Sequence, residues 1–186
     1  ILAHTVLNLY PNVKIGMGPA IEDGFYYDFD FGDKKFNETD LEKIEKEMEK
    51  IIKKDIEFRK KEISTKEAKK IFKKQPYKLE LIKDLKDNVS VYKSGDFIDL
   101  CKGPHIENTG LLKNFKLLST SGAYWHGDEK NAQLSRIYGT VFETKKELKV
   151  YLNNLEEAKK RDHRKLGKEL GRSEERRVGK ECVSEC

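Results

Sequence analysis

The chain has little of what secreted and membrane-embedded proteins depend on. Its 186 residues include three cysteines, of which only Cys101 lies in the well-patterned part, so the sequence offers no disulfide framework and fits a reducing cytoplasm. No apolar run approaches the roughly eighteen residues that a membrane-spanning helix needs. A start methionine and the residue order of a signal peptide are also absent, so we expect a soluble, cytoplasmic chain that begins inside a longer protein.

The composition is that of a charged, soluble domain. Charged residues make up 38% of the chain and hydrophobic residues 37%, and this length suffices for one compact domain or one domain plus an extension. The net charge is +5, and residues 171–186 carry four basic and four acidic residues, so the excess belongs to residues 1–170. A mild basic excess permits RNA binding but does not establish it.

The most informative stretch is DLCKGPH, residues 99–105, which places a thiol and an imidazole four residues apart across a Gly-Pro turn. Pro104 fixes its own φ and disfavours the α region at Gly103, while Gly103 tolerates unusual dihedral angles. The chain can therefore reverse and direct Cys101 and His105 into one cleft, where they could share a substrate or a metal ion. The alternative is a buried thiol beside a surface imidazole, because free Cys usually packs as a small apolar residue.

Periodicity predicts an α+β fold, with a mostly antiparallel sheet and packed helices. Helical spacing of apolar residues occurs over residues 5–10, 40–54 and 145–165, and Ser64-x-x-Glu67 is a capping box for a further short helix that Pro76 ends. Strands are expected over residues 25–29, 56–63, 89–92, 97–101, 115–118 and 133–142. In the first strand, Tyr27 shares a face with its aromatic neighbours at 25 and 29, which predicts a core face and an opposite face that could line a site.

Four stretches together carry a resemblance to a known family. They are GMGPAIEDGFYYDFD from Gly16, FIDLCKGPH from Phe97, GAYWHGDEKNAQLSRIYGT from Gly122 and LEEAKKRDHRKLGKEL from Leu155. In this order they resemble the editing domain of threonyl-tRNA synthetases and the linker helix that follows it. The resemblance implies the editing (second additional) domain fold of threonyl- and alanyl-tRNA synthetases over residues 1–143, a linker helix toward the aminoacylation domain over 144–170, and a non-native polar tail over 171–186.

The function that this resemblance implies follows from a limit on recognition. Such enzymes ligate threonine to tRNA(Thr) with ATP, and a pocket rejects a substrate that lacks one methyl group by only ~1 to 3 kcal/mol, or roughly 10- to 200-fold. A second site that admits the seryl ester and excludes the threonyl ester can hydrolyse mischarged Ser-tRNA(Thr). This reaction needs a positioned water, a proton acceptor and donors that face the developing oxyanion.

The resemblance also implies roles for particular residues. The implied catalytic residues are Lys78, Asp99, Cys101 and His105. Lys78 would orient water or stabilise negative charge, and Asp99 would hold the serine ammonium or hydroxyl group. Cys101 and His105 would line the pocket floor and hold the terminal ribose or the water.

Substrate binding is implied for Tyr27, Gly103 and Pro104, with the ring of Tyr27 stacking on a base. Without the resemblance, Lys78 would read as one of many solvated lysines and Tyr27 as a core residue.

The chain departs from the family at both ends. The family has a His-x3-His pair just upstream of the residues that match Ile1 and Leu2, so we expect an incomplete site and impaired activity in this fragment. His4 matches neither member of the pair and is not expected to be catalytic. At the other end, Cys182 and Cys186 have no second ligand pair and do not predict a metal site.

Two histidines lie in matching motifs without an assigned catalytic role. His126 occupies a turn after Trp125 where RNA contact is possible, and His163 lies on a charged helix face that we expect to meet solvent.

Two other function classes stay open. In one, Cys101, His105 and the upstream histidine pair bind zinc as in alanyl-tRNA editing domains, since one Cys and three His form a suitable tetrahedral set. In the other, the domain is a passive tRNA-binding arm.

The resemblance implies the 3′ end of tRNA(Thr) as partner, no DNA, no membrane, and homodimerisation only through domains outside the fragment. It implies no metal or cofactor in the fragment; ATP, Mg and zinc are implied only for the aminoacylation domain.

Overall fold

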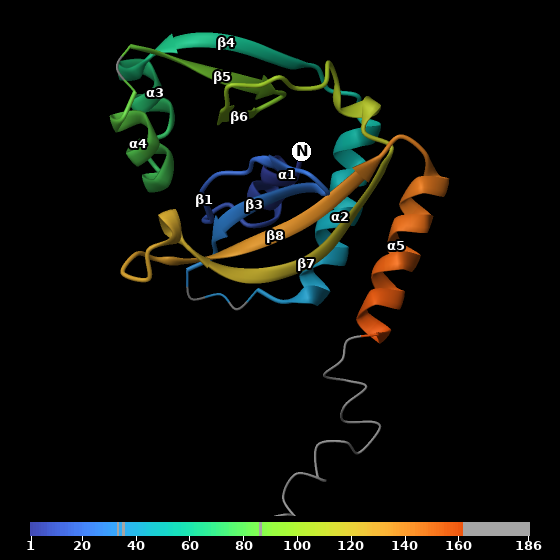
Figure 1. Cartoon of the computed structure of the whole chain (residues 1–186). Helices are drawn as coiled ribbons and strands as arrows, with labels where there is room; N and C mark the ends of the chain where they lie inside the picture. The colour runs from blue at the N-terminus through green and yellow to red at the C-terminus, as the bar shows by residue number, and fades with distance from the viewer. Residues whose placement is uncertain (33, 35, 86, 162–186) are drawn as a thin grey trace, which may run out of the picture. The chain divides into compact units, whose positions relative to one another are not determined.

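The computed structural model describes residues 1–32, 34, 36–85 and 87–161 and has an α+β fold in which the described strands pair antiparallel (Figure 1). The predicted fold class is therefore confirmed. The chain divides into a compact unit of residues 1–143 and a second unit that begins at Thr144. None of the helices described is both long and apolar enough to cross a membrane.

The second unit contains α5 (Lys145–Lys160), which begins with a reciprocal capping box. The hydroxyl of Thr144 accepts a hydrogen bond from the backbone N–H of Glu147, and the Glu147 carboxylate accepts one from the backbone N–H of Thr144. The last residues of the expected helix, residues 162–165, lie outside the described residues. The same holds for the predictions on His163, on the tail cysteines and on residues 171–186.

A five-stranded antiparallel sheet forms the base of the first unit. Its main path runs in the order β1 (Lys14–Ile15), β3 (Gly24–Asp30), β8 (Gln133–Phe142) and β7 (Asn114–Tyr124), and β2 (Ala20–Ile21) also pairs with β3. The expected strand over 133–142 is confirmed at both ends. The expected strand over 115–118 is the beginning of a longer strand, β7, whose register shifts between Leu117 and Ser119.

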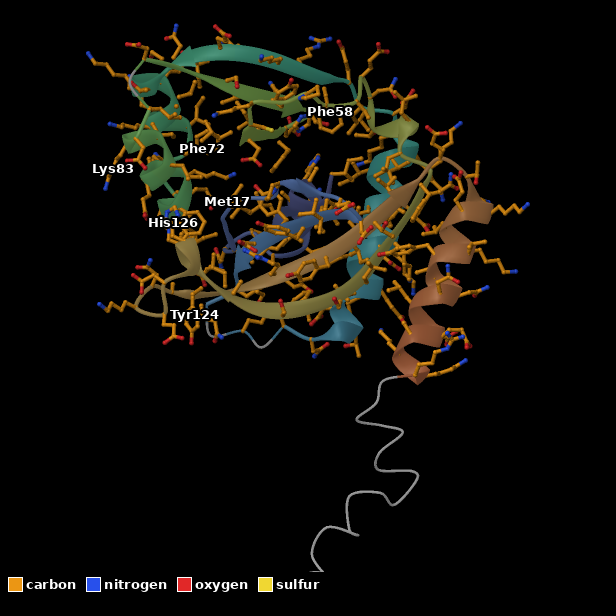
Figure 2. The ribbon with its side chains drawn as sticks, viewed as in Figure 1. Met17, Phe58, Phe72, Lys83, Tyr124 and His126 are labelled. Carbon is orange, nitrogen blue, oxygen red and sulfur yellow. The ribbon has the colours of Figure 1, made fainter. Side chains whose placement is uncertain are left out.

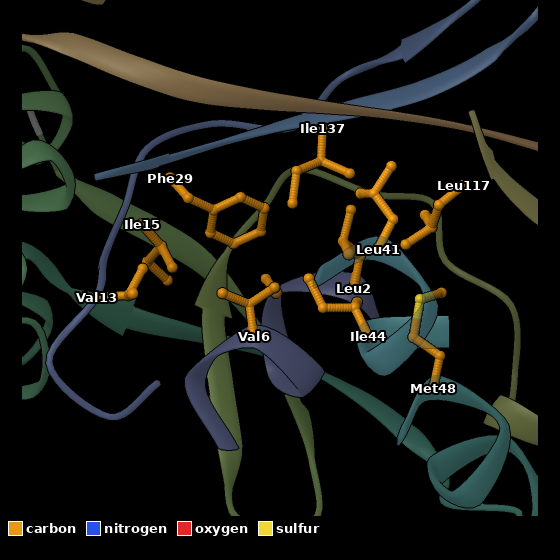
Figure 3. Close-up of a cluster of buried hydrophobic side chains, with 11 residues drawn as sticks. Leu2, Val6, Val13, Ile15, Phe29, Leu41, Ile44, Met48, Leu117 and Ile137 are labelled. Carbon is orange, nitrogen blue, oxygen red and sulfur yellow. The ribbon is translucent and has the colours of Figure 1, made fainter. Parts of the chain in front are cut away.

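The main core lies between this sheet and the helices α1 (Leu2–Leu9) and α2 (Glu38–Lys53) (Figure 3). Phe29 and Ile137 from the sheet, and Val6 and Ile44 from the helices, have no exposed side-chain surface. Burying an apolar side chain of this size contributes about 1.5 to 3 kcal/mol. Tyr27 and Phe25 are half-buried against the same cluster, so the predicted core face of β3 is confirmed.

A second sheet of three strands lies in the same unit, in the order β4 (Phe58–Ser64), β5 (Asn88–Ser94) and β6 (Phe97–Leu100). It packs with α3 (Thr65–Ile71) and α4 (Pro76–Lys83) around a separate apolar cluster. Phe72 belongs to that cluster and lies where α3 and α4 face the sheet (Figure 2). The single sheet expected from the sequence is thus two sheets.

One boundary prediction is wrong. Pro76 does not simply end the helix before it, because α3 already ends at Ile71 and Pro76 begins α4. Proline lacks a backbone N–H, but the N–H groups of a helix's first turn have no partner inside the helix, so proline there disrupts no helical hydrogen bond. Lys78 therefore lies in the first turn of a helix.

The edge strand β7 is held by α2 through one carboxylate. Glu45 accepts hydrogen bonds from the backbone N–H of Leu117, at 2.7 Å, and from Nζ of Lys116, also at 2.7 Å. A surface hollow of about 350 Å³ adjoins this contact, and its lining includes Leu41 and Leu118.

Candidate active site

Three of the residues predicted for the site meet in one cluster. The ammonium nitrogen Nζ of Lys78 lies 2.6 Å from Oδ1 of Asp99 and donates to the hydroxyl of Tyr27 at 2.9 Å. The same hydroxyl donates to Oδ2 of Asp99 at 2.6 Å. Lys78 comes from α4, Tyr27 from β3 and Asp99 from β6, so the cluster joins the two sheets.

The charged groups of this cluster are largely buried. The side chain of Lys78 is only 2% exposed and that of Asp99 15%, which rules out a solvated surface lysine. A buried charge is stable only when it is paired and hydrogen-bonded, and Asp99 supplies the opposite charge. Its Oδ1 also accepts a hydrogen bond from the backbone N–H of Leu100, at 2.7 Å. The carboxylate is therefore fixed by three donors.

Tyr27 is a donor in this cluster and remains one at physiological pH. Burial, and then the negative charge of Asp99, raise the pKa of the Tyr27 phenol well above 10. The ring of Tyr27 stacks on Phe29 at 4.9 Å, and Gly18 lies so close to it that a Cβ there would overlap the ring. Packing thus aims the hydroxyl at the Lys78–Asp99 pair.

The two faces of β3 carry different polar contacts. On the face opposite Tyr27, Asp28 is buried and forms a paired contact with Arg136, at 2.7 and 2.9 Å. The guanidinium of Arg136 in turn lies 3.9 Å from the ring centre of Tyr26. The Lys78 and Asp99 side chains gather on the Tyr27 face of β3.

Residues just before Lys78 fix the first turn of α4 to the large sheet. The side-chain amide of Gln75 accepts from the backbone N–H of Ile15 at 2.8 Å and donates to the carbonyl of Val13 at 3.3 Å. Tyr77 donates to Oδ2 of Asp30 at 2.7 Å. Neither residue was predicted for the site, since their partners lie 47 to 62 positions away in the sequence and leave no local pattern.

The turn of residues 101–105 brings the thiol and the imidazole together. Sγ of Cys101 lies 3.9 Å from Nδ1 of His105 and 3.4 Å from the backbone N–H of Gly103. The His105 ring stacks on the ring of Tyr92, with centroids 4.0 Å apart and an angle of 16° between the planes. Gly103 has φ +79°, and a Cβ there would overlap the Tyr92 hydroxyl. Only glycine fits this position without strain.

The turn and the cluster are parts of one continuous strand edge. Cys101 extends the pairing of β6, because its backbone N–H donates to the carbonyl of Ser90 and its carbonyl accepts from the Ser90 hydroxyl. In extended chain, alternate side chains share a face, so Asp99 and Cys101 face the same side. Partial burial lowers the pKa of His105, which leaves its imidazole neutral at pH 7 and able to accept a proton.

The other two described histidines lie outside this arrangement. His4 stacks on Phe97, with centroids 5.1 Å apart, and burial lowers its pKa. His126 has φ +57°, and its Nε2 lies 3.2 Å from a carboxylate oxygen of Glu80, a residue of α4 (Figure 2).

Within the described part of the chain, no group of three or more His, Cys, Asp and Glu side chains could hold a metal ion. Cys101 and His105 offer two ligands, and a structural zinc site needs four. The zinc alternative therefore depends on ligands beyond the described residues and stays a prediction.

Comparisons with known proteins agree with the resemblance seen in the sequence. Residues 89–138, which include β6, the turn and all of β5 except Asn88, match the family described as the threonyl and alanyl tRNA synthetase second additional domain. The chain is 58% identical over 173 residues to the threonine--tRNA ligase of Thermotoga neapolitana, covering 91% of this chain and 27% of that protein. The same enzyme of Oleidesulfovibrio alaskensis is also 58% identical over 173 residues, with the same coverage.

A more distant relative gives the same result. The threonine--tRNA ligase of Dehalococcoides mccartyi is 54% identical over 171 residues, which cover 91% of this chain and 29% of the relative. The chain thus spans about a quarter of the length of these relatives. Residues 89–138 belong to the threonyl and alanyl tRNA synthetase second additional domain family, and the chain is a homologue of threonine--tRNA ligases along 91% of its length.

Proposed function

We propose that residues 1–143 are a tRNA editing domain that hydrolyses Ser-tRNA(Thr) within a cytoplasmic enzyme that ligates threonine to tRNA(Thr) with ATP. The observation that carries the proposal is the buried Lys78–Tyr27–Asp99 cluster on the same strand edge as Cys101 and His105. A paired, buried lysine and a neutral imidazole are groups that ester hydrolysis can use. Residues 144–170 would be the linker helix, of which α5 is the described part.

The cluster fits the amino-acid end of the substrate. The Asp99 carboxylate can exchange its contact with Lys78 for the ammonium group of the seryl ester, since both are cations that hydrogen-bond to carboxylate. Lys78 is then free to face the oxyanion that forms on the ester carbonyl, where a fixed positive charge lowers the barrier. Tyr27 holds the geometry, because its hydroxyl touches both partners.

The turn fits the water and the ribose. The neutral imidazole of His105 accepts a proton as the water oxygen bonds to the ester carbon. The bond from that carbon to the ribose oxygen then breaks, and the ribose oxygen takes the proton back. Cys101, Gly103 and Pro104 form the floor against which the 3′-terminal ribose rests, and Tyr27 contributes to the wall beside it.

A chimera tests this function. The aligned segment of the Thermotoga neapolitana ligase is replaced by this chain, and release of serine from Ser-tRNA(Thr) is compared with release of threonine from Thr-tRNA(Thr). Serine should be released and threonine retained. Both esters carry the same ammonium and hydroxyl groups, so the pocket can distinguish them only by excluding the extra methyl group of threonine.

Asp99→Ala in the chimera should slow release of serine by about 10- to 150-fold, as expected for the ~1.5 to 3 kcal/mol of a hydrogen bond to a charged group, without admitting threonine. Asp96→Ala, an exposed residue of the same hairpin, is the matched control. Equal hydrolysis of both esters would indicate a general deacylase, and intact tRNA binding without hydrolysis would indicate a passive arm.

A further inference from the structure

The positive charge of the chain is concentrated in one segment. Residues 59–74 contain eight basic and two acidic residues, so their net charge of +6 exceeds the +5 of the whole chain. The segment covers β4 except its first residue, α3 and the turn that follows, all within the first unit. The remaining residues are close to neutral as a group.

Four exposed lysines lie along α3 and the turn that follows it. Lys66, Lys69 and Lys70 belong to the helix, and Lys73 lies in the turn just after Ile71, where it continues the spacing i, i+3, i+4, i+7. We call these four residues the basic face. The opposite side of α3 is apolar, since Ala68 and Phe72 are buried in the core of the small sheet. A helix with this pattern has one packed side and one side entirely given to positive charge.

No described carboxylate neutralises the basic face. In the structure as described, none of its four lysines forms an ion pair, whereas Lys61 on β4 pairs with Glu67 at 3.5 Å. Like charges at i, i+4 oppose helix formation, and Lys66 with Lys70 is such a pair within α3. The arrangement therefore works against the stability of a short helix, and a bound polyanion would relieve the repulsion.

We propose that the basic face binds the phosphate backbone of RNA. Lysine presents a compact charge on a flexible stem, which suits contacts to phosphates rather than paired recognition of base edges. The face would therefore position RNA without reading its sequence. The choice of RNA over another polyanion rests on the proposed function. The concentration of positive charge on the basic face is independent of that function.

The position of the basic face suits delivery of an RNA end to the candidate active site. α3 contacts α4, β4 and β5, and the turn after α3 leads directly into the first turn of α4, where Lys78 lies. Asp99 lies on β6, which pairs with β5. A duplex held at the basic face thus lies on the same three-stranded subdomain as two of the three clustered residues, and its single-stranded 3′ end can continue toward them.

Binding of uncharged tRNA(Thr) transcript to the full 186-residue chain tests the proposal, with affinity measured over a series of salt concentrations. The variant carries Lys66→Gln, Lys69→Gln and Lys70→Gln. The matched control carries Lys145→Gln, Lys146→Gln and Lys149→Gln, which removes the same charge from exposed residues of α5. Glutamine preserves helix propensity in both.

The α3 variant should bind on the order of tenfold or more weakly at low salt, and its plot of log affinity against log salt should be shallower by roughly 2 to 3 units, since each lost phosphate contact removes 0.7 to 0.9. Its melting temperature should stay the same or rise, because the repulsion is gone. Equal losses in both variants, or none in the α3 variant, would overturn the proposal.

The readout is independent of hydrolysis. If the chimera fails to release serine but the α3 variant loses affinity for RNA, RNA binding by the basic face is supported and the editing function is contradicted. If the chimera releases serine while the α3 variant binds RNA as well as the parent chain does, the editing function is supported and RNA binding by the basic face is contradicted.

Discussion

The hydroxyl of Tyr27 lies 2.6 Å from Oδ2 of Asp99, although one residue belongs to the large sheet and the other to the small one. The contact spans 72 positions of sequence and is joined at the same hydroxyl by Lys78 from α4. One phenol oxygen thus connects the three elements that carry the candidate active site.

Replacing Tyr27 by phenylalanine should keep the fold and weaken the site. The ring still packs on Phe29, but both charged groups lose a buried partner, so the free energy of unfolding should fall by about 1 to 3 kcal/mol. Release of serine by the chimera should fall with it. Urea unfolding and the deacylation assay measure the two effects. Tyr26→Phe on the opposite face is the control, and a Tyr27→Phe variant indistinguishable from it would contradict the role of the hydroxyl.

Lys78 and Asp99 should be strongly coupled in a double-mutant cycle. Lys78→Met or Asp99→Asn alone leaves the other charge buried without its partner, which typically destabilises by about 3 to 5 kcal/mol. The double variant should be less destabilised than the sum of the single variants, because no unpaired charge remains. Chemical denaturation of all four proteins gives the coupling energy. Additive single effects would mean that the contact carries little energy.

Gly103→Ala should destabilise the protein by more than the backbone strain of a positive φ accounts for. Gly103 and Gly127 have similar positive φ values, +79° and +73°, but an added Cβ overlaps the Tyr92 hydroxyl at Gly103 and meets no atom within 4 Å at Gly127. Alanine in this region costs about 1 to 3 kcal/mol in either place. We expect a larger loss of stability at Gly103, together with slower release of serine. Equal losses of stability at the two positions would show that the Tyr92 side chain moves aside at little cost.

Gln75→Ala should lower activity by displacing Lys78 without touching the substrate. The variant removes two hydrogen bonds to the backbone of residues 13–15, each worth about 0.5 to 1.5 kcal/mol. The turnover rate should fall while the affinity for tRNA is kept, because the basic face is intact. Gln75→Glu should restore part of the rate, since its carboxylate still accepts from the N–H of Ile15. Gln133→Ala, at an exposed position, is the control.

Stability should decline as the pH falls below about 6.5. Burial lowers the pKa of His4 and of His105 in the folded chain, whereas in the unfolded chain both have pKa values near 6.5. Between the unfolded and the folded pKa values, the unfolded state binds more protons and is favoured. Urea unfolding at pH 7.5 and 5.5 should show this loss, and His105→Gln should make it smaller. An unchanged difference in that variant would assign the pH dependence to other groups.

The sequence predicted the fold class and most elements because their signals are local. Alternation over residues 133–142 identified β8 at both ends, and the helical spacing of apolar residues over 40–54 identified α2. The prediction at Pro76 was wrong, since proline cannot continue a helix but is well suited to begin one. The division into two sheets has no local signal either, because it depends on which strands meet across long stretches of chain.

The candidate site was predicted in its residue types but not in its geometry. The Gly-Pro turn indicated that Cys101 and His105 lie together, and family resemblance indicated Lys78. Nothing local to Lys78 indicates that its side chain is buried, because that depends on how α4 docks through Gln75 and Tyr77 onto distant strands. The alternation pattern likewise could not show which face of β3 carries the reactive groups.

The contact between Glu45 and the backbone of Leu117 has a consequence for self-association. β7 is the last strand of its sheet, and the exposed N–H groups of such a strand can pair with a strand of another molecule. Here a carboxylate already occupies one of those N–H groups, and the register shift next to it bends the edge out of regular pairing. The β7 edge is therefore capped and irregular, which disfavours the addition of a strand from another molecule.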